Sequence, residues 1–160
     1  MTITTTSSAS VQIDQRVCLY AQDPAWQRTW LAIEAAEWRS LVFVPAGDFS
    51  SLDLVHGLAT VGWHQRGSPL IVADLRAVGL SALMAVRNEI RERVQNGDRI
   101  LIAAAGLQQN PTTASIAREA DKAILCVTAG CTARSQVKDA LRELGAQHCL
   151  GTIMTYAHGS

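Results

Sequence analysis

Residues 69–76 have the sequence Pro-Leu-Ile-Val-Ala-Asp-Leu-Arg, a short apolar run that ends in a carboxylate and a guanidinium. A non-alternating apolar run of this length is typical of a strand buried on both faces of a sheet. Four further apolar runs share this character, at residues 41–45, 99–105, 123–128 and 149–154. Segments with helical spacing of apolar residues separate them. The pattern predicts βαβ units, and hence an α/β three-layer sandwich with a mainly parallel sheet of about five strands.

The chain of 160 residues is long enough for one domain, which we place at residues 23–160. Residues 1–22 begin with a Thr/Ser-rich segment and are predicted to form a flexible N-terminal tail. The apolar runs are too short for a membrane helix, so direct membrane insertion is not expected. The four cysteines show no C-x-x-C spacing, which favours buried thiols in a reducing compartment and a cytoplasmic location.

The net charge is zero, because 14 Lys and Arg balance 14 Asp and Glu. This balance argues against a general nucleic-acid binder and against attachment to an anionic membrane by charge alone. A neutral, apolar-rich chain is poorly protected against association, so a protein partner is expected, with a homo-oligomer as one alternative.

The loop after the first predicted strand lies where a phosphate-binding loop would occur, between a strand and a helix. Such a loop needs glycines for close backbone approach, a lysine for the phosphates and a hydroxyl for Mg²⁺. This loop has one glycine and no lysine, and its residues are Pro45, Ala46, Gly47, Asp48, Phe49, Ser50 and Ser51. Taken alone, it is a very weak match to a phosphate-binding loop.

Two later strand ends carry contrasting chemistry. Asp74 and Arg76 lie at the end of the 69–75 strand, where an aspartate could hold Mg²⁺ or activate a nucleophile, or could simply form a helix cap or a local ion pair. The strand ending near Ala103 is followed by no ionisable side chain, although a Mg²⁺-dependent phosphotransferase ordinarily places a carboxylate there.

Taken in order, these segments resemble the bacterial tyrosine-kinase family of capsule and exopolysaccharide synthesis. Members of this family are the cytoplasmic ATPase domains of polysaccharide co-polymerases and are related to the ParA/MinD group of P-loop ATPases. The resemblance covers residues 38–154 and is clearest at 69–76, 120–130 and 132–154. It implies a P-loop NTPase-like fold, ATP and Mg²⁺ as the family's cofactors, and a membrane polysaccharide co-polymerase or a kinase homologue as partner.

The departures from the family pattern fall on its chemical groups. The resemblance places Phe49 at the phosphate-binding lysine, and Val72 and Ala103 at two acidic positions. Thr155 stands at the position of the asparagine that contacts the base, whereas Asp74, Arg76, Ser50 and Ser51 are retained. Loss of several electrostatic groups together is expected to abolish phosphoryl transfer.

Three tryptophans, Trp26, Trp30 and Trp38, lie within 13 residues and allow two interpretations. They belong to the core if their helix packs on the sheet, and they form a partner surface if it does not. No histidine or cysteine spacing predicts a metal site.

The sequence therefore predicts a non-catalytic domain without a cofactor, which acts in exopolysaccharide synthesis by docking to a partner, at the inner membrane through that partner. The alternative is a divergent ATPase or tyrosine kinase that binds ATP and Mg²⁺ and uses Asp74, Ser50 and a lysine from a partner chain, with Tyr156 as a candidate phosphorylation site.

Overall fold

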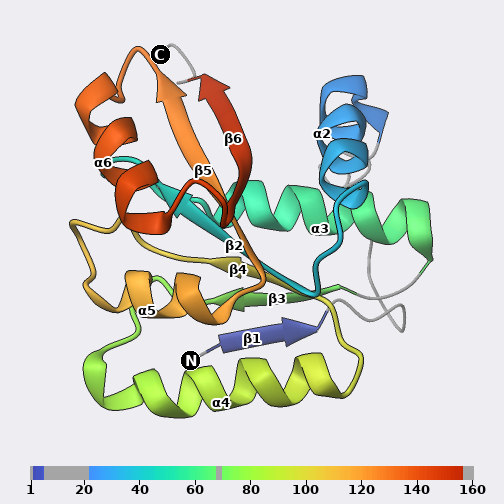
Figure 1. Cartoon of the computed structure of the whole chain (residues 1–160). Coiled ribbons are helices and arrows are strands. Elements are labelled where there is room, and N and C mark those ends of the chain that lie inside the picture. Colours follow the sequence, from blue (N-terminus) through green and yellow to red (C-terminus); the bar gives the residue numbers. More distant parts are fainter. Residues whose placement is uncertain (1, 6–21, 68–69, 157–160) are drawn as a thin grey trace.

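A computed structural model describes residues 2–5, 22–67 and 70–156. Six strands form one sheet, and five helices within these ranges cover it (Figure 1). The strands are β1 (Thr2–Thr5), β2 (Ser40–Pro45), β3 (Ile71–Asp74), β4 (Ile100–Ala103), β5 (Lys122–Ala129) and β6 (Cys149–Tyr156). The helices are α2 (Pro24–Glu34), α3 (Leu52–Arg66), α4 (Leu80–Gln95), α5 (Thr112–Glu119) and α6 (Arg134–Leu144).

The sheet has the strand order β1-β3-β4-β2-β5-β6. The five strands from β2 to β6 are all parallel, which confirms the predicted α/β sandwich with a mainly parallel sheet. All six residues of β2 are buried, because helices cover both faces of this central strand.

Strand β1 corrects part of the predicted N-terminal tail. Residues 2–5 pair antiparallel with β3, with Thr2 opposite Asp74 and Thr5 opposite Ile71. The segment is rich in threonine, whose branched side chain favours extended backbone, and β3 offers it an open edge. The rest of the predicted tail lies outside the described residues, except for Gln22.

Two hydrophobic cores lie on opposite faces of the sheet. One includes Val86 of α4, Ile116 of α5 and Leu144 of α6, together with one set of alternating strand residues. The other includes Trp30 of α2 and Val55 of α3, together with the other set. These layers are the three layers of a P-loop NTPase-like sandwich, and they bring the carboxyl ends of the parallel strands to one edge of the sheet.

Candidate functional site

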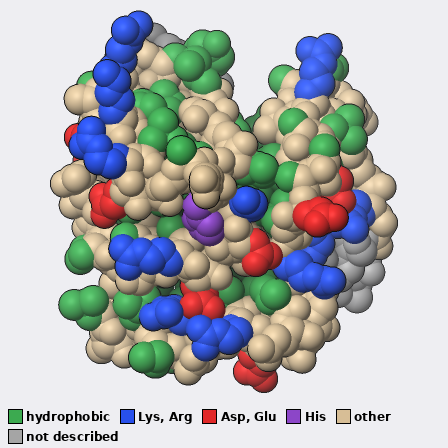
Figure 2. All heavy atoms as spheres, in the orientation of Figure 1, with side chains coloured by type: hydrophobic (Ala, Val, Ile, Leu, Met, Phe, Trp, Pro, Cys, Tyr) green, Lys and Arg blue, Asp and Glu red, His purple; other side chains and the backbone are tan. Residues whose placement is uncertain are grey.

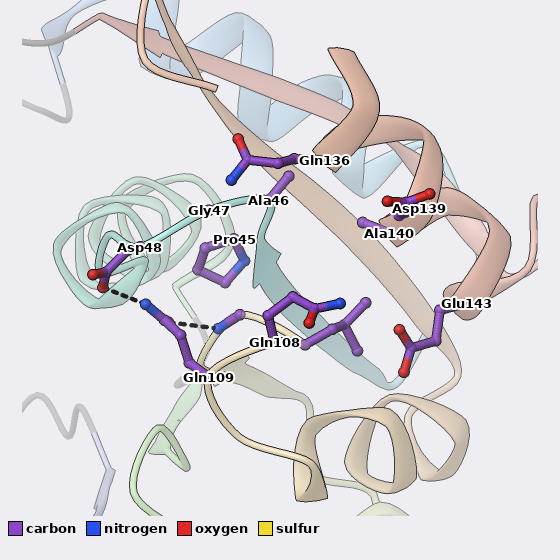
Figure 3. Close-up of a pocket in the computed structure, with 12 residues that line it drawn as sticks. Pro45, Ala46, Gly47, Asp48, Gln108, Gln109, Gln136, Asp139, Ala140 and Glu143 are labelled. Atoms are coloured by element: carbon purple, nitrogen blue, oxygen red, sulfur yellow. Dashed lines mark hydrogen bonds between the residues drawn. The ribbon is translucent and has the colours of Figure 1, made fainter. Parts of the chain in front are cut away.

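The candidate site is a pocket of about 230 Å³ at the carboxyl ends of β2 and β4 (Figure 3). Strand β2 continues toward β3 on one side of the sheet, and its neighbour β5 continues toward β6 on the other. Adjacent strands whose connections leave in opposite directions create the crevice where open α/β sheets bind ligands. The lining comes from residues 45–48, from residues 106–109 and from α6.

The 45–51 loop has the hydroxyl groups of a phosphate-binding loop, but both are engaged elsewhere. The side chain of Ser51 is buried, with Oγ 3.4 Å from the Phe43 carbonyl oxygen and 3.3 Å from that of Ala104. Ser50 Oγ accepts a hydrogen bond from the Leu52 amide at the start of α3. Ser51 therefore ties the end of β2 to β4, while Ser50 bonds the first backbone amide of α3.

Gln109 links the two loops that form the pocket floor. Its Nε2 donates a hydrogen bond to Asp48 Oδ1, and its Oε1 accepts one from the Gly106 amide at 3.2 Å (Figure 3). A Cβ atom at Gly106 would lie 2.9 Å from the Gly47 carbonyl oxygen and 3.3 Å from that of Pro45. The carbonyl oxygens of Gly47 and Pro45 therefore lie close to Gly106. A phosphate-binding loop would instead direct its backbone amide N–H groups at an anion.

The pocket carries acidic side chains and no basic one. Asp48 comes from the loop after β2, and Asp139 and Glu143 come from α6, with Gln136 one turn before them (Figure 3). No Lys or Arg is among the lining residues, all of which are described. A triphosphate would therefore meet like charges from the lining and no basic side chain within it, since Arg142, which pairs with Asp139, lies outside the lining.

Asp74, Arg76 and Ser50 come together beside this pocket. Arg76 donates to Asp74 from Nε to Oδ1 and from Nη2 to Oδ2, each at 2.8 Å, and from Nη1 to Ser50 Oγ at 2.9 Å. These hydrogen bonds from Arg76 hold the pKa of Asp74 below its ordinary value, and Asp74 in turn raises the pKa of Arg76. Among the roles that the sequence allowed for Asp74, the structure shows the local ion pair with Arg76.

The remaining predicted positions lie apart from the pocket. Val72 and Ala103 are buried in the core shared with α3, so neither side chain reaches a ligand. Thr155 of β6 lies with its Oγ1 3.3 Å from Thr128 Oγ1 and is not among the residues that line the pocket. Phe49 packs against the same core as Val72, at the position where the resemblance implies a lysine.

The tryptophan cluster is core, which corrects the partner-surface interpretation. Trp30 is fully buried and Trp38 is 5% exposed, and their rings meet edge to face with centroids 6.2 Å apart. Trp26 is partly buried and packs so closely on α3 that a Cβ at Gly57 would lie 2.6 Å from its ring. The physical reason is that the glycines of α3 leave room for indole rings between α2 and α3.

Five polar side chains of the pocket lining were not predicted from the sequence: Gln108, Gln109, Gln136, Asp139 and Glu143. Asp139 and Glu143 are four residues apart and so lie on one helix face, which was the available signal. Nothing in the sequence indicated that this face of α6 would turn toward the 45–51 loop.

Taken together, the residues do not fit a bound Mg²⁺ and nucleoside triphosphate. No lysine lines the pocket, and the charged residues of its lining are all acidic. Both carboxylate oxygens of Asp74 accept hydrogen bonds from Arg76. Within the described ranges no group of three or more His, Cys, Asp or Glu side chains is arranged to hold a metal ion. No helix in those ranges has the length and apolar character needed to cross a bilayer.

The fold and the position of the pocket define a P-loop NTPase-like α/β domain. Among solved structures it is similar to the BceF tyrosine kinase domain, with a TM-score of 0.61 and 15% sequence identity. The match covers 89% of this chain and 78% of that one, and at this identity it establishes a shared fold. No protein-family model and no curated protein sequence matches the chain.

Proposed function

We propose that this chain is a non-catalytic relative of the kinase-like P-loop domains, a pseudo-ATPase or pseudokinase that works by protein docking. The observation that carries the proposal is the Asp74–Arg76–Ser50 cluster beside a pocket lined by acids. Arg76 occupies both oxygens of the retained carboxylate and also bonds one retained hydroxyl. The groups that would hold Mg²⁺ therefore satisfy one another.

The fold shared with the BceF tyrosine kinase domain supports a setting in exopolysaccharide or capsule synthesis, as the sequence resemblance implies. The proposed partner is a membrane polysaccharide co-polymerase or a kinase homologue, with the domain in the cytoplasm and at the inner membrane through that partner. A domain that lacks the charged groups of a nucleotide site but keeps the fold still offers surfaces on which such a partner could dock.

Calorimetric titration of the full chain with ATP and Mg²⁺ tests the proposal. We expect no binding heat, for the chain itself and for Ser50→Ala alike. Micromolar affinity that Ser50→Ala abolishes would contradict the proposal, because it would show that the 45–51 loop still binds nucleotide.

The second candidate is a divergent ATPase or tyrosine kinase, which the proximity of Asp74 and Ser50 at one sheet edge favours. It requires a lysine from a partner chain, since no basic side chain lines the pocket. ATP turnover or phosphorylation of Tyr156, measured with the candidate kinase homologue present, would support it. Absence of both activities with the partner present would exclude it.

A further inference from the structure

Strand β6 is an edge strand of the sheet. It pairs with β5 on one side, and no described strand lies on the other. Its eight residues, Cys-Leu-Gly-Thr-Ile-Met-Thr-Tyr, include no charged residue and no proline. Charged side chains, prolines and short length are the usual means of preventing an edge strand from pairing. The opposite edge, by contrast, is a strand of only four residues. In the part of the chain that the structure describes, the outer edge of β6 therefore has no strand partner and can pair with a further strand.

A row of cations runs along α6 beside this edge. Arg134, Lys138 and Arg142 are spaced four residues apart and are all exposed, so they form one stripe on the helix. Figure 2 shows Lys and Arg side chains in a row over α6. Arg142 lies 3.4 Å from Asp139, whereas neither Arg134 nor Lys138 has an ion pair with a described residue.

The position of the stripe follows from the other faces of α6. Ala140 and Leu144 face the core, and Gln136, Asp139 and Glu143 face the pocket on the β2 side of β5. Arg134, Lys138 and Arg142 occupy the side of α6 that faces neither the core nor the pocket. Since β2 and β6 lie on opposite sides of β5, that flank is the one toward β6.

The two faces of the β6 edge differ in chemistry. Met154 and Tyr156 are 57% and 75% exposed and pair with Val127 and Ala129, on the same sheet face as α6. On the other face, Leu150 and Ile153 border a groove of about 300 Å³ between β6 and α2. No charged residue lines this groove, and Figure 2 shows the molecule hollowed between these two elements.

We propose that the β6 edge binds an extended segment of a partner protein that alternates acidic and apolar residues. The segment would add a strand beside β6, with its acidic side chains toward the α6 stripe and its apolar side chains toward the α2 groove. This inference rests on the proposed docking function and names the chemistry of the partner. Charge complementarity disfavours a second copy of this chain as the occupant, because two-fold pairing of β6 strands would bring two basic stripes together.

The probe is a fluorescent eight-residue peptide that alternates glutamate and valine, titrated into the full chain and followed by anisotropy at neutral pH. We expect saturable binding that weakens as salt rises, and none for a lysine–valine peptide. Lys138→Glu should weaken binding about fivefold or more. Arg118→Glu on α5 is the matched control, since it also reverses an exposed cation that has no ion pair with a described residue, and it should leave binding unchanged.

Two peptides methylated at alternate sets of backbone amides test strand addition directly. One set should abolish binding and the other should not, because only one edge of an added strand faces β6. Equal binding by both methylated peptides, no binding of the glutamate–valine peptide, or no effect of Lys138→Glu would each overturn the proposal. So would a dimer, detected by sedimentation, that excludes the peptide. None of these outcomes alters the nucleotide titration, so this inference can fail while the proposed function stands.

Discussion

Arg76 donates two hydrogen bonds of 2.8 Å to Asp74, one to each carboxylate oxygen. A paired geometry of this kind is among the strongest that side chains make with each other. In this chain it joins the end of β3 to the start of the following loop, and the third donor of Arg76 reaches Ser50 before α3. The retained acidic residue is thus part of a loop-to-loop contact.

The Asp74 pair predicts an acid-dependent loss of stability. Because Arg76 lowers the pKa of Asp74 in the folded chain, the ionised carboxylate stabilises the fold above the ordinary aspartate pKa of about 3.9. This contribution is lost as the pH falls through the lowered folded value. The free energy of unfolding of Asp74→Asn, measured in urea, should therefore lie below that of the unsubstituted chain at pH 6 and approach it near pH 3. In the Arg76→Ala background the Asp74→Asn substitution should show little pH dependence; a persistent difference would assign the effect to another group.

Gln109 should stabilise the contact between the two pocket loops. Gln109→Ala removes the hydrogen bonds to Asp48 and from the Gly106 amide and should cost about 1 kcal/mol in the free energy of unfolding. Gln108→Ala is the matched control, because the side chain of Gln108, the neighbour of Gln109, is exposed and makes no hydrogen bond with a described residue. Equal effects of the two substitutions on the urea midpoint would mean that the link contributes nothing.

Gly62 tests the core position of the tryptophans. A Cβ at Gly62 would lie 2.6 Å from Trp30 and from Leu70, so Gly62→Ala should destabilise the fold by about 1–3 kcal/mol. The near-ultraviolet circular dichroism of the indoles should change with it. Gly79→Ala, where nothing lies within 4 Å, should cost only about 0.5 kcal/mol, from the poorer N-cap that alanine gives α4. An unperturbed spectrum and unchanged stability for Gly62→Ala would place Trp30 outside the core.

The cysteines should differ sharply in reactivity. Burial raises the pKa of Cys126 to about 12, whereas Cys131 is exposed in the loop after β5. The thiolate is the reactive form, so Cys131 should alkylate in the folded protein at pH 8 and Cys126 only in denaturant. Peptide mapping by mass spectrometry after iodoacetamide treatment measures both. Modification of Cys126 at the rate of Cys131 without denaturant would show that the sheet opens locally.

The apolar runs were sufficient to predict the α/β layers. Each run forms a strand within a few residues of its expected bounds. The runs of β2 and β4 are apolar because both faces of these strands are buried, whereas β6 at the sheet edge is apolar although much of it is exposed. Two helix ends coincide with a local signal in the sequence. Asp23 accepts a hydrogen bond from the Ala25 amide at the start of α2, and Gly67 ends α3 with φ at +65°.

Other local predictions failed because a nearby group competed. Thr132 is of a residue type favoured as a helix N-cap, but its Oγ1 accepts a hydrogen bond from the Thr128 amide instead. Ala133 precedes α6, and its amide donates to Gln136 Oε1. Strand β1 was missed because four threonine-rich residues form a strand only when an edge such as β3 is available to pair with them.

The sequence by itself determined which charges this chain possesses and which it lacks: no lysine in the 45–51 loop and no acid at Val72 or Ala103. That information is covalent and independent of folding. Only the tertiary structure decided where the remaining charges act. It turned the acidic flank of α6 toward the pocket and the basic flank toward β6, and it placed Arg76 on Asp74. These relationships depend on strand order and on helix rotation about the sheet, which arise from packing between residues distant in the chain.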